Sequence, residues 1–428
     1  MIKTEEIHIG IVGLGYVGLP LAHLFASHYP TVGYDCNSLR VAELLEANDI
    51  TLEVDSTQLK RVSQNGQLKF TDNPEDLKDC NVYIIAVPTP VDCNNHPDLT
   101  PLINASHTVG TILDKDNVVI YESTVYPGVT EDECVPALLS TSCLVYNKDF
   151  FVGYSPERVN PSDKEHTVET IVKVTSGSTP ETADFVDELY KSVLRNGTHK
   201  APSIRVAEAS KIVENCQRDV NIAFINELAK IFSAMDIDTN DVLAAAGTKW
   251  NFIKMKPGLV GGHCISVDPY YLIEKAQVYG VLPRVMYAAR RLNDSMGAYV
   301  ASQVIKQMNL KGMPVKNANI LILGFAFKEN CPDTRNTKVV DIYRSLEEYT
   351  PNITVCDPWV DSTRTKKEFN ITINNSLADI QRNTYDVAIL AVAHRQFSGI
   401  DIRKLVPQPG VVYDVKGILP RQQIDARL

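Results

Sequence analysis

The chain has 428 residues, of which 44% are hydrophobic and 22% are charged, so it can form the cores of two or three globular domains. Its formal net charge of −10, with no long run of one sign, argues against nucleic acid or an anionic membrane as the main partner. Nine cysteines are scattered without a CxxC pair, which argues against a disulfide framework or a metal site and indicates a reduced, cytoplasmic protein.

The first apolar segment, residues 9–26, follows Lys3 and therefore resembles a signal peptide or a short membrane span. However, Glu5 and Glu6 stand where such a leader carries positive charge, and Pro20 and four glycines interrupt the apolar run. We interpret this segment as a buried strand that leads into a helix, and we expect no membrane-spanning segment.

A glycine-rich turn follows the strand predicted for residues 7–12, and it reads Gly13-Leu14-Gly15-Tyr16-Val17-Gly18. In a dinucleotide-binding turn the first glycine makes the tight turn, the second lets the pyrophosphate approach, and the third lets helix and strand pack closely. A second predicted strand ends in Asp35, at the distance typical of the acid that binds the ribose, and a carboxylate there favours NAD over NADP. The alternative is a turn that only packs a helix on a sheet.

Apolar runs at 82–87 and 118–121 predict further strands of a parallel sheet covered on both faces. Thr89 and Thr124 follow the carboxyl ends of these runs, where such sheets bind ligands. Their hydroxyls could contact the nicotinamide or a catalytic water, or could simply cap the next helix. Glu157 follows the next strand in the same way, and a surface acid paired with Arg158 is the alternative.

Residues 207–235 show helical spacing of apolar side chains without a glycine or proline, which predicts an unusually long helix. Such a helix could join two domains and bury one face against a partner subunit. Lys211 and Asn215 are four residues apart and share one face, where a lysine and an amide together can bind an oxyanion. A solvated helix surface is the alternative.

A glycine-rich loop precedes Cys264, and it reads Pro257-Gly258-Leu259-Val260-Gly261-Gly262-His263-Cys264-Ile265-Ser266-Val267-Asp268. Glycines let a backbone approach a ligand closely, so this cysteine can be exposed and reactive rather than part of a core. His263 could serve as its general base, but adjacent residues of an extended chain point in opposite directions. We therefore interpret His263 as structural or substrate-contacting.

The last third of the chain predicts a second nucleotide-binding fold that lacks a GxGxxG turn. Its apolar strands are predicted at 319–325, 353–358, 387–392 and 411–415, with a helix near 339–348.

These motifs, taken in order with Phe327-Lys328 and Asp333-x-Arg335, resemble the UDP-glucose/GDP-mannose dehydrogenase family, and the resemblance covers essentially the whole chain. It implies an α/β protein with two Rossmann-like doubly wound parallel-sheet domains joined by a long central helix. The implied domains are an NAD-binding domain at 1–200, a central helical and dimerisation domain at 201–305, and a UDP-binding domain at 306–428. It also implies a homodimer.

The chemistry implied by the resemblance is a four-electron oxidation of a sugar C6 alcohol by two NAD⁺, through a thiohemiacetal and a thioester on Cys264. Lys211 and Asn215 would stabilise the oxyanion at C6. Three further residues would orient or activate water, namely Asp268, Thr124 and Glu157.

The resemblance also implies two sets of binding residues. Cofactor contacts would come from Gly13, Gly15, Tyr16, Val17, Gly18, Asp35, Arg40, Thr89, Thr124, Lys328 and Arg335. Substrate contacts would come from Glu157, Arg158, Lys211, Asn215, Gly258, Gly261, His263, Lys328 and Arg335.

The cysteine loop resembles the UDP-N-acetylhexosamine 6-dehydrogenase branch, because UDP-glucose enzymes typically carry a serine before the cysteine. Ser266 and Leu259 depart from the branch pattern and could alter the loop's shape. The stretch 155–161 resembles enzymes that act on UDP-GlcNAc or UDP-GalNAc, whose products feed surface polysaccharides. The alternatives are UDP-N-acetylmannosamine or UDP-glucose as substrate, a two-electron dehydrogenase, and a nucleotide-sugar-binding protein without turnover.

Overall fold

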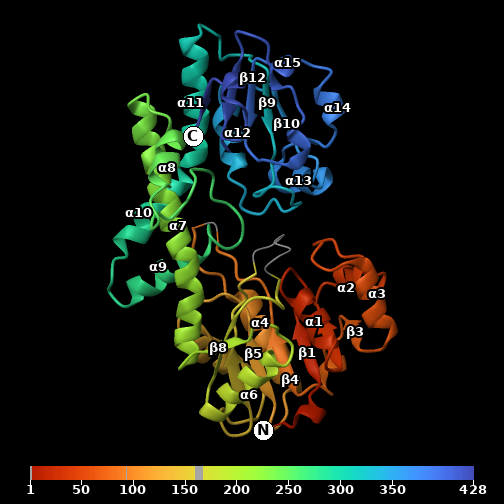
Figure 1. Cartoon of the computed structure of the whole chain (residues 1–428). Coiled ribbons are helices and arrows are strands. Elements are labelled where there is room, and N and C mark those ends of the chain that lie inside the picture. The colour runs from red at the N-terminus through yellow and green to blue at the C-terminus, as the bar shows by residue number, and fades with distance from the viewer. Residues whose placement is uncertain (1, 93, 160–166) are drawn as a thin grey trace. The chain divides into compact units, whose positions relative to one another are not determined.

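A computed structural model describes residues 2–92, 94–159 and 167–428 (Figure 1). The chain forms two compact units, one made of Met1–Glu214 with Tyr270–Val281, and the other of Asn215–Pro269 with Leu282–Leu428. Helix α7 (Ile204–Ala234), which contributes residues to both units, confirms the predicted long helix. Within the described residues, no helix combines the length and the apolar character that crossing a membrane would require.

The first unit is built on an eight-stranded sheet with the order β3-β2-β1-β4-β5-β6-β7-β8. Only the β6–β7 pair is antiparallel. The order 3-2-1-4-5-6 is that of a dinucleotide-binding Rossmann fold. The strands are β1 (Ile9–Val12), β2 (Thr31–Tyr34), β3 (Leu68–Thr71), β4 (Val82–Ile85), β5 (Val118–Tyr121), β6 (Phe151–Tyr154), β7 (Lys173–Gly177) and β8 (Thr198–Lys200).

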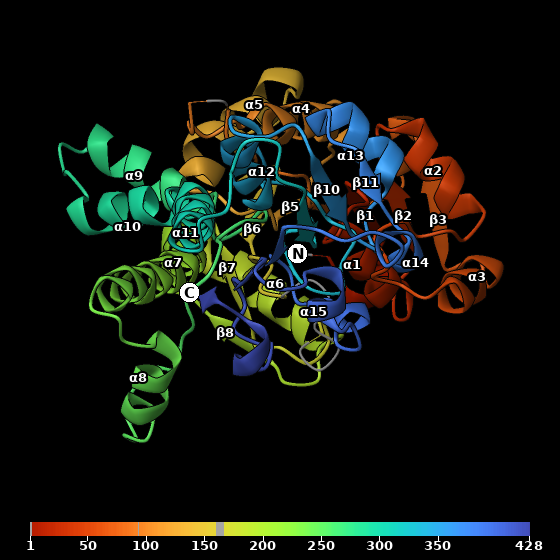
Figure 2. The same ribbon diagram turned by 90° about the horizontal axis from the view of Figure 1, so that it is seen from above.

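Helices cover both faces of this sheet, because alternate strand residues enter two separate hydrophobic cores. Val82 and Ile84 pack with α1 and α6, whereas Tyr83 and Ile85 pack with α4 and α5. Figure 2 shows α4 and α5 on one side of the sheet and α6 on the other. The helices of this unit are α1 (Gly18–Ala26), α2 (Ser38–Leu45), α3 (Ser56–Gln64), α4 (Thr100–Ile112), α5 (Val135–Thr141) and α6 (Pro180–Lys191).

The second unit contains an all-parallel sheet with the order β11-β10-β9-β12-β13-β14, which repeats the Rossmann order. Helices α11 and α12 pack on one face, and α14 and α15 on the other. The strands are β9 (Ile320–Leu323), β10 (Ile353–Cys356), β11 (Ile373–Asn374), β12 (Val387–Leu390), β13 (Val411–Asp414) and β14 (Ala426–Arg427). The helices beyond α7 are α8 (Thr239–Ala246), α9 (Asp268–Val278), α10 (Arg284–Asp294), α11 (Met296–Leu310), α12 (Val339–Glu347), α13 (Ser362–Phe369), α14 (Leu377–Ile380) and α15 (Ile402–Leu405).

In each of the two sheets, the first strand is followed by a turn of the same conformation. Gly13 and Gly324 have φ values of +93° and +92°, and each N–H donates across to the next strand, to Tyr34 and Cys356 respectively, at 2.8 Å. Both conformations favour glycine. The predicted fold class, two doubly wound parallel-sheet domains with a long helix between them in sequence, is therefore confirmed.

Candidate functional site

The three glycines of the first turn differ in what surrounds them. A Cβ at Gly13 would lie 2.8 Å from the Ala86 carbonyl oxygen, and one at Gly18 would lie 1.7 Å from the Gly13 carbonyl oxygen. A Cβ at Gly15 would meet nothing within 4 Å. Glycine is thus needed for packing at the outer two positions, whereas the middle position opens onto space next to the N-terminus of α1. This arrangement fits a pyrophosphate group.

Asp35 is fixed beside the turn, as the acid of a ribose site should be. Its Oδ2 accepts a hydrogen bond from Leu14 N at 2.9 Å and its Oδ1 accepts one from Asn37 N at 2.9 Å, while the residue stays partly exposed. The predicted cofactor contact Arg40 is buried instead, and it donates to the Leu14 carbonyl and pairs with Asp49 at 2.8 Å. In this structure Arg40 supports the turn from within the protein.

The turns that follow β4 and β5 are tied together by hydroxyl groups. Thr89 Oγ1 donates to the Thr124 carbonyl at 2.7 Å, and Ser123 Oγ donates to the Val87 carbonyl at 2.7 Å. The alternative role of Thr89 as a helix cap is wrong, because α4 begins at Thr100 after Leu99. The two predicted threonines therefore lie together at the carboxyl edge of the first sheet.

The turn that follows β6 holds Glu157 by its own backbone. Glu157 Oε1 accepts from Arg158 N at 2.6 Å and from Val159 N at 2.5 Å, and its buried Oε2 has no partner among the described residues. The Arg158 side chain turns away, to Glu214 at 2.7 Å and to the Val172 carbonyl. A Glu157–Arg158 side-chain pair is therefore not formed. Residues 160 and 161, used in the sugar assignment, lie outside the described residues.

Lys211 and Asn215 on α7 are both buried, so their alternative role as a solvated helix surface is wrong. Asn215 Nδ2 donates to Asp268 Oδ2 at 2.5 Å. Asp268 is also buried and begins α9. The structure thus brings together two of the predicted catalytic residues, although they are 53 positions apart in the sequence.

Cys264 lies on a partly exposed part of its loop, and its carbonyl accepts hydrogen bonds from Val267 N and Asp268 N at 3.1 and 2.8 Å. Burial raises the pKa of four other cysteines to about 12, which keeps them protonated and unreactive at neutral pH. These four are Cys80, Cys134, Cys216 and Cys356. Exposure therefore favours Cys264 over them as a nucleophile.

The glycines before Cys264 let its loop pack against the loop that follows β9. A Cβ at Gly261 would lie 2.6 Å from the Asn336 carbonyl oxygen, and one at Gly262, where φ is +84°, would lie 2.8 Å from the Phe327 ring. His263 lies in the electrostatic field of Arg335 and Asp333. Burial, assisted by the charge of Arg335, lowers the pKa of His263 to about 4, so the imidazole is neutral at pH 7.

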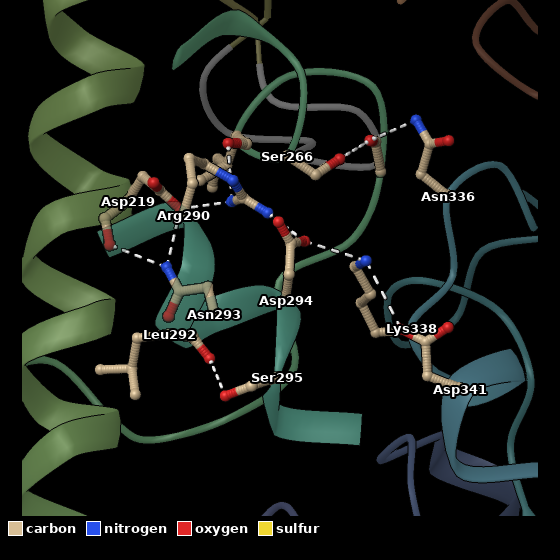
Figure 3. A network of polar contacts seen from close by, with 12 residues as sticks. Asp219, Ser266, Arg290, Leu292, Asn293, Asp294, Ser295, Asn336, Lys338 and Asp341 are labelled. Atoms are coloured by element: carbon tan, nitrogen blue, oxygen red, sulfur yellow. Dashed lines mark hydrogen bonds and ion pairs between the residues drawn. The ribbon is translucent and has the colours of Figure 1, made fainter. Parts of the chain in front are cut away.

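A buried polar network supports the same loop from α7 and α10 (Figure 3). Arg290 pairs with Asp219 at 2.6 Å and with Asp294 at 2.6 Å, and it donates to the Ile265 carbonyl, next to Cys264, at 3.4 Å. Asn293 donates to Asp219 Oδ1 at 2.7 Å. Sequence reasoning missed this network, because no local motif links residues on three separate segments.

Asp294 connects the network to the second sheet's domain. Lys338, at the N-terminus of α12, lies 2.9 Å from Asp294. Asn336 Nδ2 donates to the Gly262 carbonyl at 3.1 Å, and Ser266 Oγ donates to the same carbonyl at 2.5 Å. The loop that carries Cys264 is thus bound at several backbone positions.

A pocket lies at the carboxyl ends of β9 and β12, where the strand order of the second sheet reverses. Open α/β sheets bind ligands at such switch points. Two lysines line it, each with an acid nearby: Lys338 pairs with Asp294 and Asp341, and Lys416 lies 3.7 Å from Glu329. Its lining consists of Leu259, Gly261, Ala326, Phe327, Thr337, Lys338, Val339, Ala391, Val392 and Lys416. The predicted Lys328 directly follows one lining residue, and the guanidinium of the predicted Arg335 forms a bidentate pair with Asp333.

Comparisons with known proteins agree with these features. Three models of the UDP-glucose/GDP-mannose dehydrogenase family match the chain: its NAD binding domain at residues 7–194, its central domain at 205–295 and its UDP binding domain at 321–421. UDP-N-acetyl-D-glucosamine 6-dehydrogenase of Pseudomonas aeruginosa is 55% identical over 99% of this chain and 100% of its own length. The protein of that name from Salmonella typhi is 50% identical over 100% of both. The solved structure of UDP-D-ManNAc dehydrogenase from Pyrococcus horikoshii matches with a TM-score of 0.89 at 31% identity, covering 98% of each chain.

Proposed function

The chain belongs to the UDP-glucose/GDP-mannose dehydrogenase family, and we propose that it oxidises the C6 alcohol of a UDP-N-acetylhexosamine to a carboxylate with two NAD⁺. The observation that carries the proposal is the partly exposed Cys264 on a loop to which the buried Arg290 side chain donates a hydrogen bond. The names of the two bacterial relatives, which match over nearly their whole length, support the same activity.

Each domain has a proposed role. The first, at 1–200, holds NAD on the turn 13–18, with Asp35 against the ribose; Tyr16, Val17, Thr89 and Thr124 are further proposed contacts. The third, at 306–428, holds UDP at the pocket beside β9 and β12, with Lys328 and Arg335 as proposed contacts. The centre, at 201–305, supplies the cysteine loop, in which Gly258, Gly261 and His263 are proposed to contact the substrate, together with Glu157 and Arg158.

NAD, when bound, accepts one hydride in each of the two oxidations. In the proposed mechanism, the Cys264 thiolate adds to the C6 aldehyde that the first oxidation produces. This addition creates the alkoxide that a free aldehyde lacks, and it keeps a reactive intermediate attached to the protein. Loss of the second hydride leaves a thioester, and water then releases the acid and the thiol.

The remaining proposed roles follow from charge and placement. Lys211 and Asn215, buried one helical turn apart on α7, stabilise negative charge on the C6 oxygen. The carboxylate of Asp268, which accepts from Asn215, orients that amide. Asp268, Thr124 and Glu157 orient or activate the hydrolytic water, and Glu157 Oε2, which has no partner among the described residues, supplies an acceptor for it.

We propose UDP-GlcNAc or UDP-GalNAc as the substrate, because the two similar full-length bacterial proteins carry the GlcNAc name. UDP-N-acetylmannosamine is the second candidate, because of the solved archaeal structure. A uronic acid still attached to UDP is an activated sugar donor, which suits surface polysaccharide synthesis. Both co-substrates imply the cytoplasm as the compartment.

The decisive experiment measures NADH formed per sugar consumed, on UDP-glucose and on the three UDP-N-acetylhexosamines. We expect two NADH per UDP-GlcNAc or UDP-GalNAc and little activity on UDP-glucose. One NADH per sugar would contradict the covalent mechanism, and a preference for UDP-glucose would contradict the acetamido assignment. Tight binding of the sugar nucleotide without turnover would identify a binding protein.

A homodimer is proposed from the exposed face of α7. Four apolar side chains about half exposed, at positions that differ by 7, 11 and 7 residues, fall within about 20° of one line along the helix. They are Val206, Val213, Phe224 and Ile231. An apolar stripe of this kind suits contact with a second copy. Sedimentation should show a dimer for the wild-type protein and a monomer for Phe224→Asp/Ile231→Asp; a wild-type monomer would contradict the proposal.

A further inference from the structure

A fully buried ion pair lies at the carboxyl edge of the first sheet. Lys173, at the start of β7, places its Nζ 2.6 Å from Glu122 Oε2, just after β5, and neither side chain is exposed to solvent. Tyr190 of α6 donates to the other carboxylate oxygen of Glu122. A buried ion pair is rarely more stable than apolar residues of similar size. Stability alone therefore does not account for it.

Both partners of the pair hold the turn that carries Glu157. Lys173 Nζ donates to the Pro156 carbonyl at 2.9 Å and lies 3.5 Å from the Ser155 carbonyl. The backbone carbonyl of Glu122 accepts from Glu157 N at 3.3 Å. The carbonyl and the N–H of the Pro156–Glu157 peptide bond are thus fixed by the Lys173 side chain and by the Glu122 backbone carbonyl, respectively.

The charges of Lys173 and Glu157 also act on the Glu122 carboxyl group. Burial raises the pKa of Glu122 to about 7. The positive charge of Lys173 lowers this pKa, and the negative charge of Glu157 raises it further. The negative charge of Glu157 thus acts on Glu122, and the Lys173 ammonium opposes it there.

We propose that Glu122 and Lys173 are positioning residues that hold the turn 155–157, so that the Glu157 carboxylate can orient the water that hydrolyses the thioester on Cys264. The inference rests on the proposed function. In that step, water adds to the thioester carbonyl, Glu157 accepts a proton from it, and the Cys264 sulfur leaves with the electron pair of the broken C–S bond. Displacement of Glu157 should slow this step more than the two oxidations that precede it.

The test uses Lys173→Met, Glu122→Gln/Lys173→Met and Tyr190→Phe in the full chain, with Asp187→Asn as the matched control. Asp187 is also buried and lies on α6, but it bonds Thr175, Thr198 and Lys191 rather than the turn. Intact-protein mass after mixing with UDP-GlcNAc and NAD⁺ reports the acyl adduct on Cys264. Turnover gives kcat and KM, and titration gives the Kd for NAD.

We expect kcat to fall at least tenfold in the double variant, with the Kd for NAD within twofold of wild type and the acyl adduct accumulating. The double variant should also unfold at a higher temperature than Lys173→Met, because it buries no unpaired carboxylate. Recovered stability without recovered turnover separates positioning from folding.

Tyr190→Phe keeps both charges, so it tests the proposal even if the charge variants fail to fold. It should accumulate the adduct to a smaller extent, and the control should accumulate none. Wild-type kcat without adduct in the folded variants would overturn the inference. A wild-type protein that forms no acid from any UDP-N-acetylhexosamine would overturn the proposed function, and this inference with it.

Discussion

Asn226 and Gly258 form a reciprocal pair, in which Gly258 N donates to Asn226 Oδ1 at 2.8 Å and Asn226 Nδ2 donates to the Gly258 carbonyl at 3.0 Å. The buried Asn226 amide thus makes with the Gly258 backbone the two hydrogen bonds that a neighbouring strand would make. Asn226 Nδ2 also reaches Asn293 Oδ1 at 2.9 Å, which joins this pair to the Arg290 network.

Asn226→Ala should loosen the start of the cysteine loop. It removes both hydrogen bonds to Gly258 and leaves Asn293 without one partner, so we expect a loss of about 1–3 kcal/mol in unfolding free energy. We also expect kcat to fall more than substrate affinity. Denaturant unfolding and steady-state kinetics measure both, with exposed Asn309→Ala as the control. Wild-type stability in Asn226→Ala would show that the pair contributes nothing.

Arg290→Met should be among the most destabilising single changes in the chain. It leaves the buried Asp219 carboxylate without its cation, which typically costs about 3–5 kcal/mol. Arg291→Met is the matched control, because the neighbouring arginine is exposed on the same helix. Thermal unfolding distinguishes the two. The double variant Arg290→Met/Asp219→Asn should recover part of the lost stability. Equal melting temperatures for Arg290→Met and Arg291→Met would contradict this account.

Cys264→Ser should keep sugar-nucleotide binding and abolish acid formation, because a hydroxyl is a far weaker nucleophile than a thiolate. Calorimetric titration with the UDP-sugar and product analysis after incubation with NAD⁺ measure the two effects. Exposed Cys143→Ser is the control and should behave as wild type. Uronic acid formed by Cys264→Ser at near the wild-type rate would rule out the thioester.

His263 should make the protein sensitive to acid. Its pKa is lowered to about 4 in the folded state, against 6.5 when unfolded, so between these values the unfolded chain binds the proton and the folded chain does not. Stability is therefore present above pH 6.5 and lost as the pH falls toward 4, by up to about 3 kcal/mol. Comparison of wild type with His263→Gln by denaturant unfolding at pH 7 and pH 4.5 isolates this effect. The prediction would be wrong if the difference in unfolding free energy between wild type and His263→Gln were the same at pH 7 and at pH 4.5.

The strands that the sequence predicted are those with continuous apolar runs, such as β4 and β5, whose four residues are all buried. It did not predict β7 and β8, because Lys173 and the polar residues of β8 carry no apolar signal. The buried Lys173 pairs with Glu122, which directly follows β5. Pairings of this kind depend on the folded sheet and leave no local pattern.

The candidate site shows the same division. Spacing was enough to place Lys211 and Asn215 on one helix face and Asp35 beside the glycine turn. Spacing could not place Arg40 against Asp49, nor Arg290 beneath Ile265, because those contacts depend on packing between separate segments. The assigned roles of the site residues stay predictions until the variants are measured.

Asp35 and Asp357, which follow β2 and β10, differ in how many further hydrogen bonds their carboxylates can accept. Asp357 is fully buried, and its two oxygens accept from His394 and from four backbone N–H groups. Asp35 stays partly exposed, and its carboxylate accepts hydrogen bonds from Leu14 N and Asn37 N. A ribose hydroxyl can therefore find an acceptor at the first acid and not at the second. We expect the chain to have one binding site for NAD, in its first domain. A rise in cellular NAD should then not displace the sugar nucleotide from the second sheet.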